Sequence, residues 1–340
     1  MSENVTLKKI AAELGVSAMT VSRALNNHDN VDEKTRERII KKARSMGYTP
    51  NRVAKSLVSK RTFTIGVVIP EISHTFFARV VGGIENVTYE SDYQLLLTNS
   101  AEKAEREKKA LETLLAQQVD GILISCSEET EETSFYKKII DSGKPLVFFD
   151  RCIEGIGAST VSVDDRIGSR KMTQHMIDHG YQKLAYLRGP EISIGKERLE
   201  GFLDAMNQND LDIQENWIVE SGFKEQGGYE AMKQILEASD SEIPTAVVAV
   251  NDPAAIGAME AIEEFGYFVP DDIAICGFSD DIRASLLKCP LTTVYQPSES
   301  IGRKAAEKLI RVIENREEPV ENIDLPTNLV IRQSCGCEKS

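Results

Sequence analysis

Two kinds of hydrophobic pattern divide the chain, and the change between them falls near residue 62. Before this point, apolar residues recur at spacings of three and four, which is the period of an amphipathic helix. From Phe63 onward, short apolar runs alternate with helical stretches. Alternation of strands and helices is typical of parallel sheets covered by helices. The pattern therefore predicts a small helical head followed by a larger α/β body.

Residues 6–26 have the pattern of two short helices joined by a tight turn. Ile10 and Leu14 fall on one helical face, Gly15 interrupts the pattern, and Ser17 is a good N-cap for a second helix. These features predict a helix-turn-helix whose second helix can lie in a DNA major groove. The alternative is a small helical corner within a larger domain.

Two more helical segments complete the head. Residues 32–46 form a third helix, with Asp32 as N-cap and Gly47 as stop. Residues 51–60 share one apolar face, but so short a helix is marginal alone in water. We assign residues 1–50 to a three-helix DNA-binding domain and 51–61 to a hinge helix, which is an ordinary linker unless a partner such as DNA orders it.

The body contains two successive series of strands and helices. The predicted strands are 63–69, 93–98, 120–125 and 145–150 in the first series, and 183–188, 217–221, 245–250 and 272–277 in the second. The predicted helices are 77–91, 103–117 and 132–142, then 166–179, 196–208, 226–238 and 253–265. A strand at 291–297, a helix at 298–314 and a last strand at 323–331 follow. The expected fold class is α/β, with two doubly wound lobes and a ligand cleft between them.

Charge separates the two parts further. The chain has a net charge of −14, yet residues 1–61 hold 13 Lys or Arg and 6 Asp or Glu, a net +7 against −21 for the rest. A basic head on an acidic body predicts one module that binds a polyanion and one that binds something else.

The cysteines and targeting signals favour a cytoplasmic protein with reduced thiols. The six cysteines form no regular framework, no signal peptide is evident, and no apolar run approaches the roughly 20 residues of a membrane span. Cys335-Gly336-Cys337 is a candidate metal or redox motif, although no second cysteine pair lies nearby.

Motifs of catalysis and cofactor binding are missing. Gly195-Lys196 fails the P-loop pattern because Pro190 and Glu197 occupy required positions, and no dinucleotide, hydrolase or zinc-protease motif occurs. His175 and His179 lie one helical turn apart, which allows metal binding, but a histidine there also complements the helix C-terminal dipole, and we favour this structural role. We therefore expect no enzyme activity, no cofactor and no metal.

Several motifs then follow one another in a specific order. These are GVSAMTVSRALN, VDEKTRERI, GYTPNRVAKSL, TIGVVIP, RLEGF, AVNDPAAIGAM, CGFSDD and PLTTVYQP. Over essentially its whole length the chain resembles bacterial transcription regulators of the lactose-repressor/galactose-repressor (LacI/GalR) family. The body resembles periplasmic sugar-binding proteins. The expected effector-binding lobes are 62–162 with 294–323, and 163–293 with 324–334.

The resemblance implies a homodimer on a palindromic operator, with Ala18, Met19 and Arg23 reading bases. Arg23 can bind a guanine edge bidentately, whereas Ala18 and Met19 offer only apolar contacts, so the half-site sequence stays open. In this family the residue matching Leu57 is a wedge in the minor groove, and the alternative is a core leucine. Other expected DNA-contacting residues are Thr6, Ser17, Thr20, Ser22, Asn26, Asn51 and Ala54.

The resemblance also implies an effector pocket of aromatic and planar polar groups. Its expected residues are His74, Phe76, Phe77, Asp150, Arg151, Arg198, Phe223, Asn251, Ser279 and Gln296. Such groups suit a polyhydroxylated ligand. Ser279 stands where Asp is usual and His74 near where Asn is common, which extends the expected ligand from a sugar to a modified sugar or an acid. Asp150 and Asn251 have the alternative role of capping helices or closing loops.

A ligand-responsive transcriptional regulator, expected to be a repressor, accounts for all these features. The alternatives are a regulator that responds to a purine or another small metabolite, and a solute-binding protein, which leaves residues 1–61 unexplained. Induction and co-repression both stay open. No heptad pattern follows Cys337, so we expect no tetramerising coiled coil.

Overall fold

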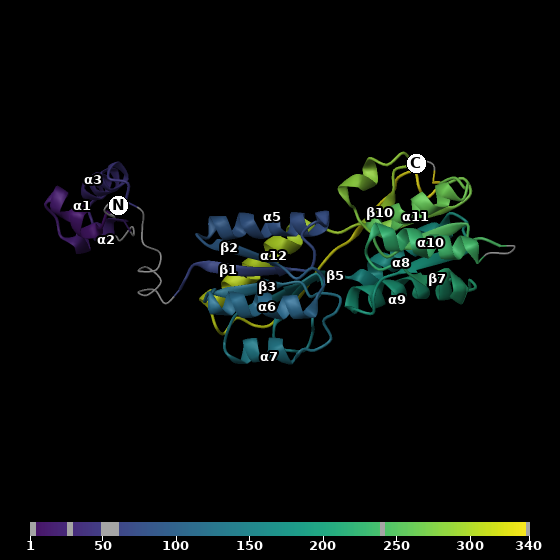
Figure 1. Ribbon diagram of the computed structural model, residues 1–340, viewed down its shortest axis with the longest axis horizontal. Coiled ribbons are helices and arrows are strands. Elements are labelled where there is room, and N and C mark those ends of the chain that lie inside the picture. The colour runs from purple at the N-terminus through teal and green to yellow at the C-terminus, as the bar shows by residue number, and fades with distance from the viewer. Residues whose placement is uncertain (1–4, 26–29, 49–60, 239–241, 338–340) are drawn as a thin grey trace. The chain divides into compact units, whose positions relative to one another are not determined.

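The computed structural model describes residues 5–25, 30–48, 61–238 and 242–337. Its contacts divide the chain into two units, Met1–Thr62 and Phe63–Ser340, which we describe separately (Figure 1). The described part of the first unit is helical and the second unit is α/β, as the change of hydrophobic pattern predicted. Among the described residues, none of the helices combines the length and the apolar character that crossing a membrane requires.

The first unit is a three-helix head. Its helices are α1 (Leu7–Leu14), α2 (Ala18–Leu25) and α3 (Glu33–Ser45). The predicted caps are confirmed, because Ser17 Oγ accepts a hydrogen bond from the Thr20 amide at 3.0 Å and Asp32 accepts one from Thr35 at 3.0 Å. Ile10, Val21 and Ile39 from the three helices form the buried core. The turn between α1 and α2 uses Gly15 at φ 67°, a conformation that glycine adopts without steric cost.

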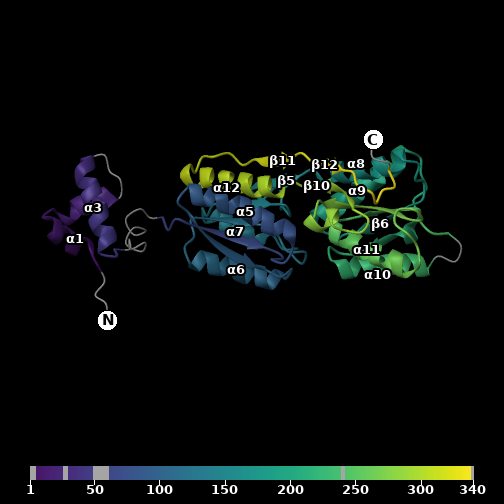
Figure 2. The same ribbon diagram turned by 90° about the horizontal axis from the view of Figure 1, so that it is seen from above.

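The first lobe of the second unit is built on a six-stranded parallel sheet in the order β11-β5-β4-β3-β1-β2. The strands are β1 (Thr64–Ile69), β2 (Gln94–Asn99), β3 (Gly121–Ile124), β4 (Leu146–Phe149), β5 (Ser159–Val163) and β11 (Asn322–Leu325). Helices α5 (Thr75–Glu90) and α12 (Ser298–Glu314) cover one face, and α6 (Ala104–Ala116) and α7 (Ser134–Asp141) cover the other (Figure 2). Because helices cover both faces, the strands are nearly continuous apolar runs.

The second lobe repeats this architecture in the order β12-β10-β9-β8-β6-β7, with β12 antiparallel. Its strands are β6 (Leu184–Arg188), β7 (Ile218–Glu220), β8 (Ala246–Ala249), β9 (Ala274–Ser279), β10 (Thr292–Tyr295) and β12 (Asn328–Val330). Helices α8 (Asp165–Asp178) and α9 (Ser193–Gln208) pack on one face, and α10 (Glu225–Glu237) and α11 (Asp252–Glu264) on the other. Two short 3-10 helices, η1 (Glu215–Trp217) and η2 (Ile282–Ser285), complete the lobe.

The structure corrects the sequence prediction in two places. Strand β5, Ser-Thr-Val-Ser-Val, was missed because its hydroxyl side chains interrupt the apolar run. The single strand predicted at 323–331 is wrong, since β11 and β12 belong to different sheets. Pro326 lies between them, and proline cannot donate a backbone hydrogen bond to a sheet.

The chain passes between the lobes after β5, β10 and β11 (Figure 2). These strands end at Val163, Tyr295 and Leu325, within two residues of the boundaries expected after 162, 293 and 323. The reason is physical: each strand keeps its sheet partners to its end before the chain crosses.

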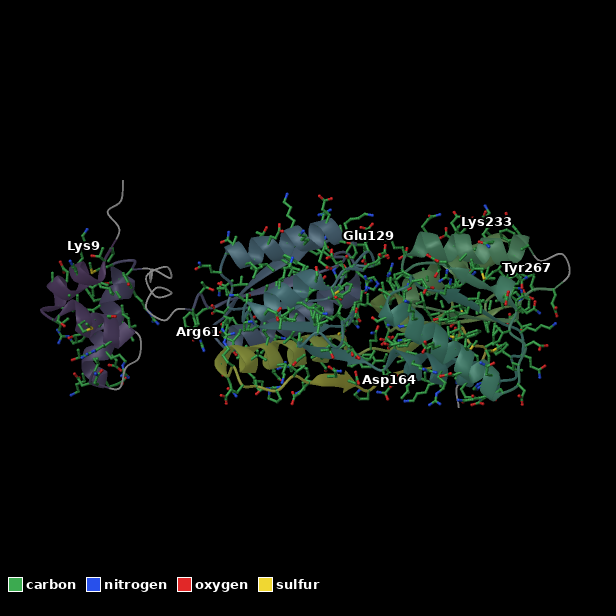
Figure 3. All side chains as sticks on the ribbon, turned by 90° about the horizontal axis from the view of Figure 1, so that it is seen from below. Lys9, Arg61, Glu129, Asp164, Lys233 and Tyr267 are labelled. Carbon is green, nitrogen blue, oxygen red and sulfur yellow. The ribbon has the colours of Figure 1, made fainter. Side chains whose placement is uncertain are left out.

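On the surface of this unit, side chains such as that of Glu129 project outward (Figure 3).

Candidate functional site

One cavity between the two lobes is lined by all ten body residues for which the sequence predicted a ligand role. Ile194 is the further lining residue. Asp150 and Arg151 follow β4, and Asn251 follows the residue after β8. Ser279 ends β9, and Gln296 follows β10. The carboxyl ends of parallel strands are the usual ligand-binding edge of such sheets, so the topology explains why residues distant in sequence meet here.

The lobes are closed around this cavity. Its free space for water-sized molecules is about 30 Å³, far below the several hundred Å³ of a typical ligand pocket. Thr75 Oγ1, at the start of α5, donates to Asp281 Oδ2 of the second lobe at 2.7 Å. Arg79 also donates to the Asp280 carbonyl at 3.4 Å. In this conformation the cavity therefore has little free space for a ligand.

Arg151 lies at the centre of the closed cavity. Its Nη1 donates to both carboxylate oxygens of Glu102, at 2.7 and 2.8 Å, and both side chains are less than a tenth exposed. Its guanidinium carbon lies 4.7 Å from the ring centre of Phe223 and 5.8 Å from that of Phe77, so it contacts an aromatic ring from each lobe. Its Nε is buried without a hydrogen-bond acceptor in the described structure. Arg151 thus has an unused donor beside the cavity.

Arg198 of α9 is the second buried arginine of the site. Its Nε donates to Asp165 at 2.7 Å and its Nη1 donates to the Val250 carbonyl at 2.7 Å. The guanidinium also lies 3.8 Å from the ring centre of Phe278. A guanidinium has five N–H donors, and the contacts with Asp165 and Val250 occupy about three of them. The remaining donors can serve a ligand.

Asp150 is the buried carboxylate of the cavity. Burial, partly offset by the nearby Arg151, raises the pKa of Asp150 to about 6. Its nearest amide partner is Gln296, whose Nε2 lies 3.5 Å from Oδ1, so the hydrogen bond is long. Asp150 therefore has acceptor capacity that the protein leaves largely unused.

Two of the predicted residues, His74 and Asn251, also form hydrogen bonds that stabilise the local backbone. The Nδ1 of His74 accepts a hydrogen bond from the Phe76 amide at the start of α5, and burial together with Arg151 lowers the pKa of His74. Asn251 caps α11 through the Ala254 amide at 2.9 Å and donates to the Phe223 carbonyl at 2.9 Å. The capping alternative for Asn251 is therefore confirmed, and the same bonds orient its amide beside the cavity.

Ser279 and its neighbour Asp280 have different surroundings. Ser279 lines the cavity at φ 119°, and its hydroxyl is buried without a hydrogen-bond partner in the described structure. Asp280 instead forms an ion pair with Arg332 at 2.6 Å and is not among the lining residues. Ser279, rather than the adjacent Asp280, is therefore the residue that lines the cavity.

Sequence reasoning missed the residues that hold the arginines. Glu102 and Asp165 pair with Arg151 and Arg198, and Phe278 stacks on Arg198. The only available signal was general, because a buried arginine requires a carboxylate partner. Asp252 was also missed: it is fully buried, accepts hydrogen bonds from the Thr293 hydroxyl and the Asp281 amide, and fixes the loop after β9.

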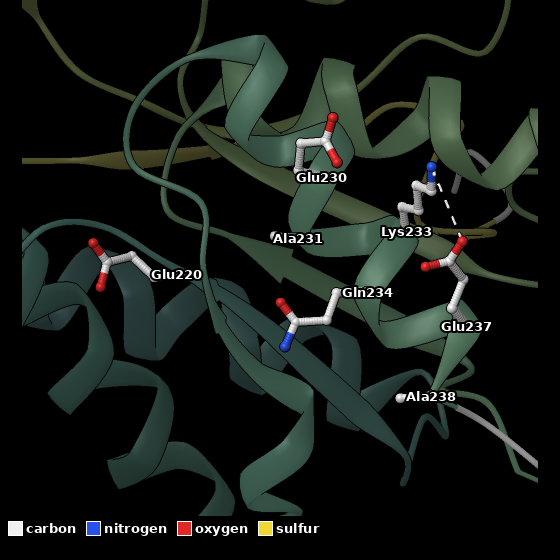
Figure 4. A pocket seen from close by; sticks show the side chains of 7 residues that line it. All are labelled: Glu220, Glu230, Ala231, Lys233, Gln234, Glu237 and Ala238. Carbon is white, nitrogen blue, oxygen red and sulfur yellow. Dashed lines mark ion pairs between the residues drawn. The ribbon is translucent and has the colours of Figure 1, made fainter.

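A larger hollow, outside the cleft, is lined by residues of α10 and by Glu220 at the end of β7 (Figure 4). It measures about 510 Å³ and is lined mainly by exposed side chains such as Glu230 and Glu237. Lys233 and Glu237 form an ion pair at 4.0 Å across its edge. No unpartnered buried polar group lines it among the described residues, so we do not regard it as a ligand site.

The head presents part of the predicted DNA surface. Arg23 and Met19 of α2 are exposed, Met19 to 61%, while Ala18, Thr20 and Ser22 are partly exposed. Thr6 and Ser17 are exposed and also cap α1 and α2. Asn26, Asn51, Ala54 and Leu57, like the predicted hinge helix, lie outside the described residues.

A helix-turn-helix head joined to a two-lobed body with an interlobe cavity defines a class: DNA-binding regulators controlled by a small ligand. Residues 6–51 match the model of bacterial regulatory proteins of the lacI family, and residues 173–335 match that of the periplasmic binding protein-like domain. The ribose operon repressor of Haemophilus influenzae is 32% identical over 330 residues, which cover 97% of this chain and 98% of that protein. The chain therefore belongs to the LacI family of bacterial regulatory proteins and is a ligand-responsive transcriptional regulator, not an enzyme.

Solved structures agree over nearly the whole chain. The lac repressor dimer bound to operator and the anti-inducer ONPF aligns with a TM-score of 0.87 at 28% identity, covering 98% of this chain and 99% of that one. The complex of the regulator CelR with cellobiose aligns with a TM-score of 0.74 at 30% identity, covering 97% and 100%.

Proposed function

We propose that this regulator is a cytoplasmic repressor that binds a palindromic operator as a homodimer, and that a sugar or sugar derivative in the interlobe cavity controls its operator affinity. The observation that carries the effector proposal is the set of unused polar groups around one cavity. Among the described residues, Arg151 Nε and Ser279 Oγ are buried without hydrogen-bond partners, and the side chain of Asp150 accepts a long hydrogen bond from Gln296. An unsatisfied buried polar group costs about 1–3 kcal/mol, so a ligand that satisfies these groups gains affinity.

The chemistry of the lining favours a polyhydroxylated ligand. Arg151 and Arg198 supply donors, Asp150 supplies acceptors, and Ser279 supplies both. Phe76, Phe77 and Phe223 supply apolar faces. Each hydroxyl of a sugar ring can both donate and accept a hydrogen bond, and the C–H groups of the ring form apolar faces, which matches this arrangement. The cellobiose complex of CelR and the name of the ribose operon repressor are consistent with a sugar.

The operator proposal rests on the basic head and the exposed side of α2. Ala18, Met19 and Arg23 are proposed to contact bases, with Thr6, Ser17, Thr20, Ser22 and Asn26 on the DNA backbone and Asn51, Ala54 and Leu57 at the operator centre. The operator complex of the lac repressor dimer supports two-fold binding. In a dimer the two heads are related by symmetry, which a palindromic operator matches.

A ligand screen tests the effector proposal. The full-length protein is heated with sugars, sugar acids and purines, and a cleft ligand raises the melting temperature by mass action. For a sugar hit, Ser279→Ala is expected to weaken calorimetric affinity about tenfold, because a ligand hydrogen bond is lost while no protein partner is orphaned. Ser285→Ala, at an exposed site on η2, is the matched control. Stabilisation by purines alone, or equal affinities in both variants, would reject the sugar site.

An operator titration tests the DNA proposal. Operator DNA is selected from a random pool and its binding followed by fluorescence anisotropy at two salt concentrations, with and without the ligand. We expect a palindromic site and a steep salt dependence from phosphate contacts. Tighter binding with ligand indicates co-repression and weaker binding indicates induction. Selection of no symmetric sequence would contradict the dimeric operator model.

A further inference from the structure

Three potential metal ligands meet in the second lobe, at the end of α8 and after β12. They are His175, Cys335 and Cys337, whose ligand atoms all lie within 4.8 Å of one another. Cys337 Sγ lies 3.4 Å from His175 Nε2. None of the three lines the interlobe cavity, so the regulator function derived above does not use them.

The distances agree with one small metal ion. In a tetrahedral zinc site with Zn–S near 2.3 Å and Zn–N near 2.0–2.1 Å, neighbouring sulfur and nitrogen ligands are about 3.6 Å apart and two sulfurs about 3.8 Å apart. The His175–Cys337 separation is 3.4 Å, and the remaining pairs lie within 4.8 Å, so shifts of up to about 1 Å bring them to these values. A donor set of two thiolates and one imidazole favours a thiophilic ion.

The segment that carries the cysteines is held in place from both sides. Ser334 Oγ donates to the Ile275 carbonyl at 2.6 Å and accepts from the Thr292 amide at 2.8 Å. Tyr181 donates its hydroxyl proton to the Cys335 carbonyl at 3.0 Å. The backbone on which the two cysteines lie is therefore fixed to β9, β10 and the end of α8 before any ion binds.

Gly336 allows the two thiols to approach the same histidine. It has φ 70°, and a Cβ atom at this position would lie 2.6 Å from the Tyr181 hydroxyl. Only glycine combines this left-handed turn with the close approach of Tyr181. The turn between Cys335 and Cys337 thus depends on the residue that separates them.

His175 is also oriented by its surroundings. Its side chain is almost fully buried, and the ring of His179 lies 4.4 Å away, centre to centre. The Nδ1 of His179 contacts the His175 carbonyl at 2.7 Å, which holds the second ring against the last turn of α8. The Nε2 of His175 then faces Cys337. Histidine nitrogen and cysteine sulfur are common zinc ligands, so this group of side chains can bind a metal ion.

We propose that His175, Cys335 and Cys337 bind a thiophilic divalent cation of the zinc type, which connects the C-terminal segment to α8 independently of the effector cavity. Three protein ligands leave one position of a tetrahedral ion for water. Binding to the folded form alone stabilises the protein, so the site adds stability to the second lobe whenever the ion is present.

The test uses the full-length protein, reduced with a phosphine and freed of metal. Cobalt(II) is added as a spectroscopic probe, and zinc affinity is measured by competition with a chromophoric chelator. We expect one ion per chain, an intense thiolate-to-cobalt charge-transfer band, tetrahedral d–d bands, and a rise in melting temperature with zinc. Cys337→Ser, at a partly exposed position, is expected to weaken zinc binding by at least about 100-fold and to halve the charge-transfer intensity.

Two further variants make the outcome decisive. His175→Gln is expected to weaken zinc binding while preserving the thiolate bands, since both cysteines remain. Cys289→Ser, in the same lobe but outside the cluster, is expected to bind zinc normally. The proposal is overturned if the reduced protein gives no charge-transfer band, if Cys337→Ser binds zinc like the parent, or if Cys289→Ser loses binding to the same extent. Operator binding by each variant verifies that the protein is folded.

Discussion

Among the single residues around the interlobe cavity, the buried charged side chains differ in how well they are compensated, and this difference affects the stability of the protein. Arg151 forms an ion pair with Glu102, and Arg198 forms one with Asp165. The positive charge of each arginine is therefore compensated by a carboxylate. Within the described part of the chain Asp150 has no comparable ion pair, and burial raises its pKa to about 6. The carboxylate is therefore retained at a cost in stability, which is typical of a group kept for function.

Asp150→Asn is expected to stabilise the ligand-free protein at pH 7.5. Its folded pKa lies above its ordinary value of 3.8, so the folded protein binds the extra proton and loses stability as the pH rises between about 4 and 6. Above pH 6 the full cost of a two-unit shift applies, at most roughly 3 kcal/mol. We expect the variant to gain about 1–3 kcal/mol at pH 7.5 and little at pH 4, measured by urea unfolding.

Asp212→Asn, an exposed position, is the control for this change and should alter stability little at either pH. Unchanged or lower stability of Asp150→Asn at pH 7.5 would show that the carboxylate is better compensated than its surroundings indicate. The effector found in the screen should bind Asp150→Asn more weakly, because an amide offers one acceptor oxygen where the carboxylate offers two.

Arg23→Ala tests the base contact proposed for the exposed side of α2. Loss of a bidentate guanine contact is expected to lower operator affinity by about 1–3 kcal/mol and to relax base preference at one position of each half-site. Selection from randomised DNA measures both effects. Arg38→Ala removes an equal charge from an exposed position on α3 and should weaken binding to all sequences alike, if at all. Identical selected sequences for Arg23→Ala and the parent would exclude the contact.

At the scale of elements, close helix crossings built on glycine recur in both lobes. On Gly83 of α5 a Cβ atom would lie 2.1 Å from the Glu299 carbonyl of α12, and on Gly302 of α12 it would lie 2.0 Å from the Val80 carbonyl. The α10–α11 pair repeats the arrangement with Gly228 and Gly257, at 2.0 and 1.9 Å. The absence of a side chain at these glycines lets the backbones of two helices approach closely, so that each pair of helices packs together on one face of its sheet.

Gly83→Ala is expected to destabilise the first lobe, whereas Gly82→Ala in the same helix should not. The methyl group at position 83 would clash with backbone, which cannot rotate away, so we expect a loss of at least about 2 kcal/mol. Position 82 is open within 4 Å, and alanine there should add about 0.5–1 kcal/mol through helix propensity. Urea unfolding of both variants checks the difference; equal effects would contradict the close crossing.

The elements also show which parts of the fold a single sequence can predict. Long apolar runs such as β1 and β8 were predictable because strands buried on both faces have little polar interruption. Strand β5 could not be predicted in this way, because its Ser and Thr residues interrupt the apolar run and its place in the sheet depends on the neighbouring strands. The site was predicted through the resemblance, but the pairing of Arg151 with Glu102 joins residues 49 positions apart and needs the folded topology.

At the scale of the whole second unit, the two lobes close over a cavity too small for the proposed ligand. Arg151 contacts Phe223 across the cleft, and Thr75 donates to Asp281. Burial raises the pKa of Asp281, but hydrogen bonds from Arg283 and Thr75 outweigh it and lower that pKa to about 2, so Thr75 donates to a charged acceptor at neutral pH. The two contacts therefore help to hold the lobes together at the cavity.

Thr75→Val measures how far this hydrogen bond holds the lobes closed. A cysteine introduced as Ser279→Cys is buried at the cavity, so its labelling by a bulky maleimide reports opening; peptide mass spectrometry separates it from the native thiols. Losing a hydrogen bond to a charged acceptor, worth about 1.5 kcal/mol or more, should increase the open population and the labelling rate roughly tenfold. Thr75→Ser keeps the hydroxyl and should label at the parent rate. If Thr75→Val also labels at that rate, closure is held by the Arg151–Phe223 contact and the surrounding packing, and the control of ligand entry lies there.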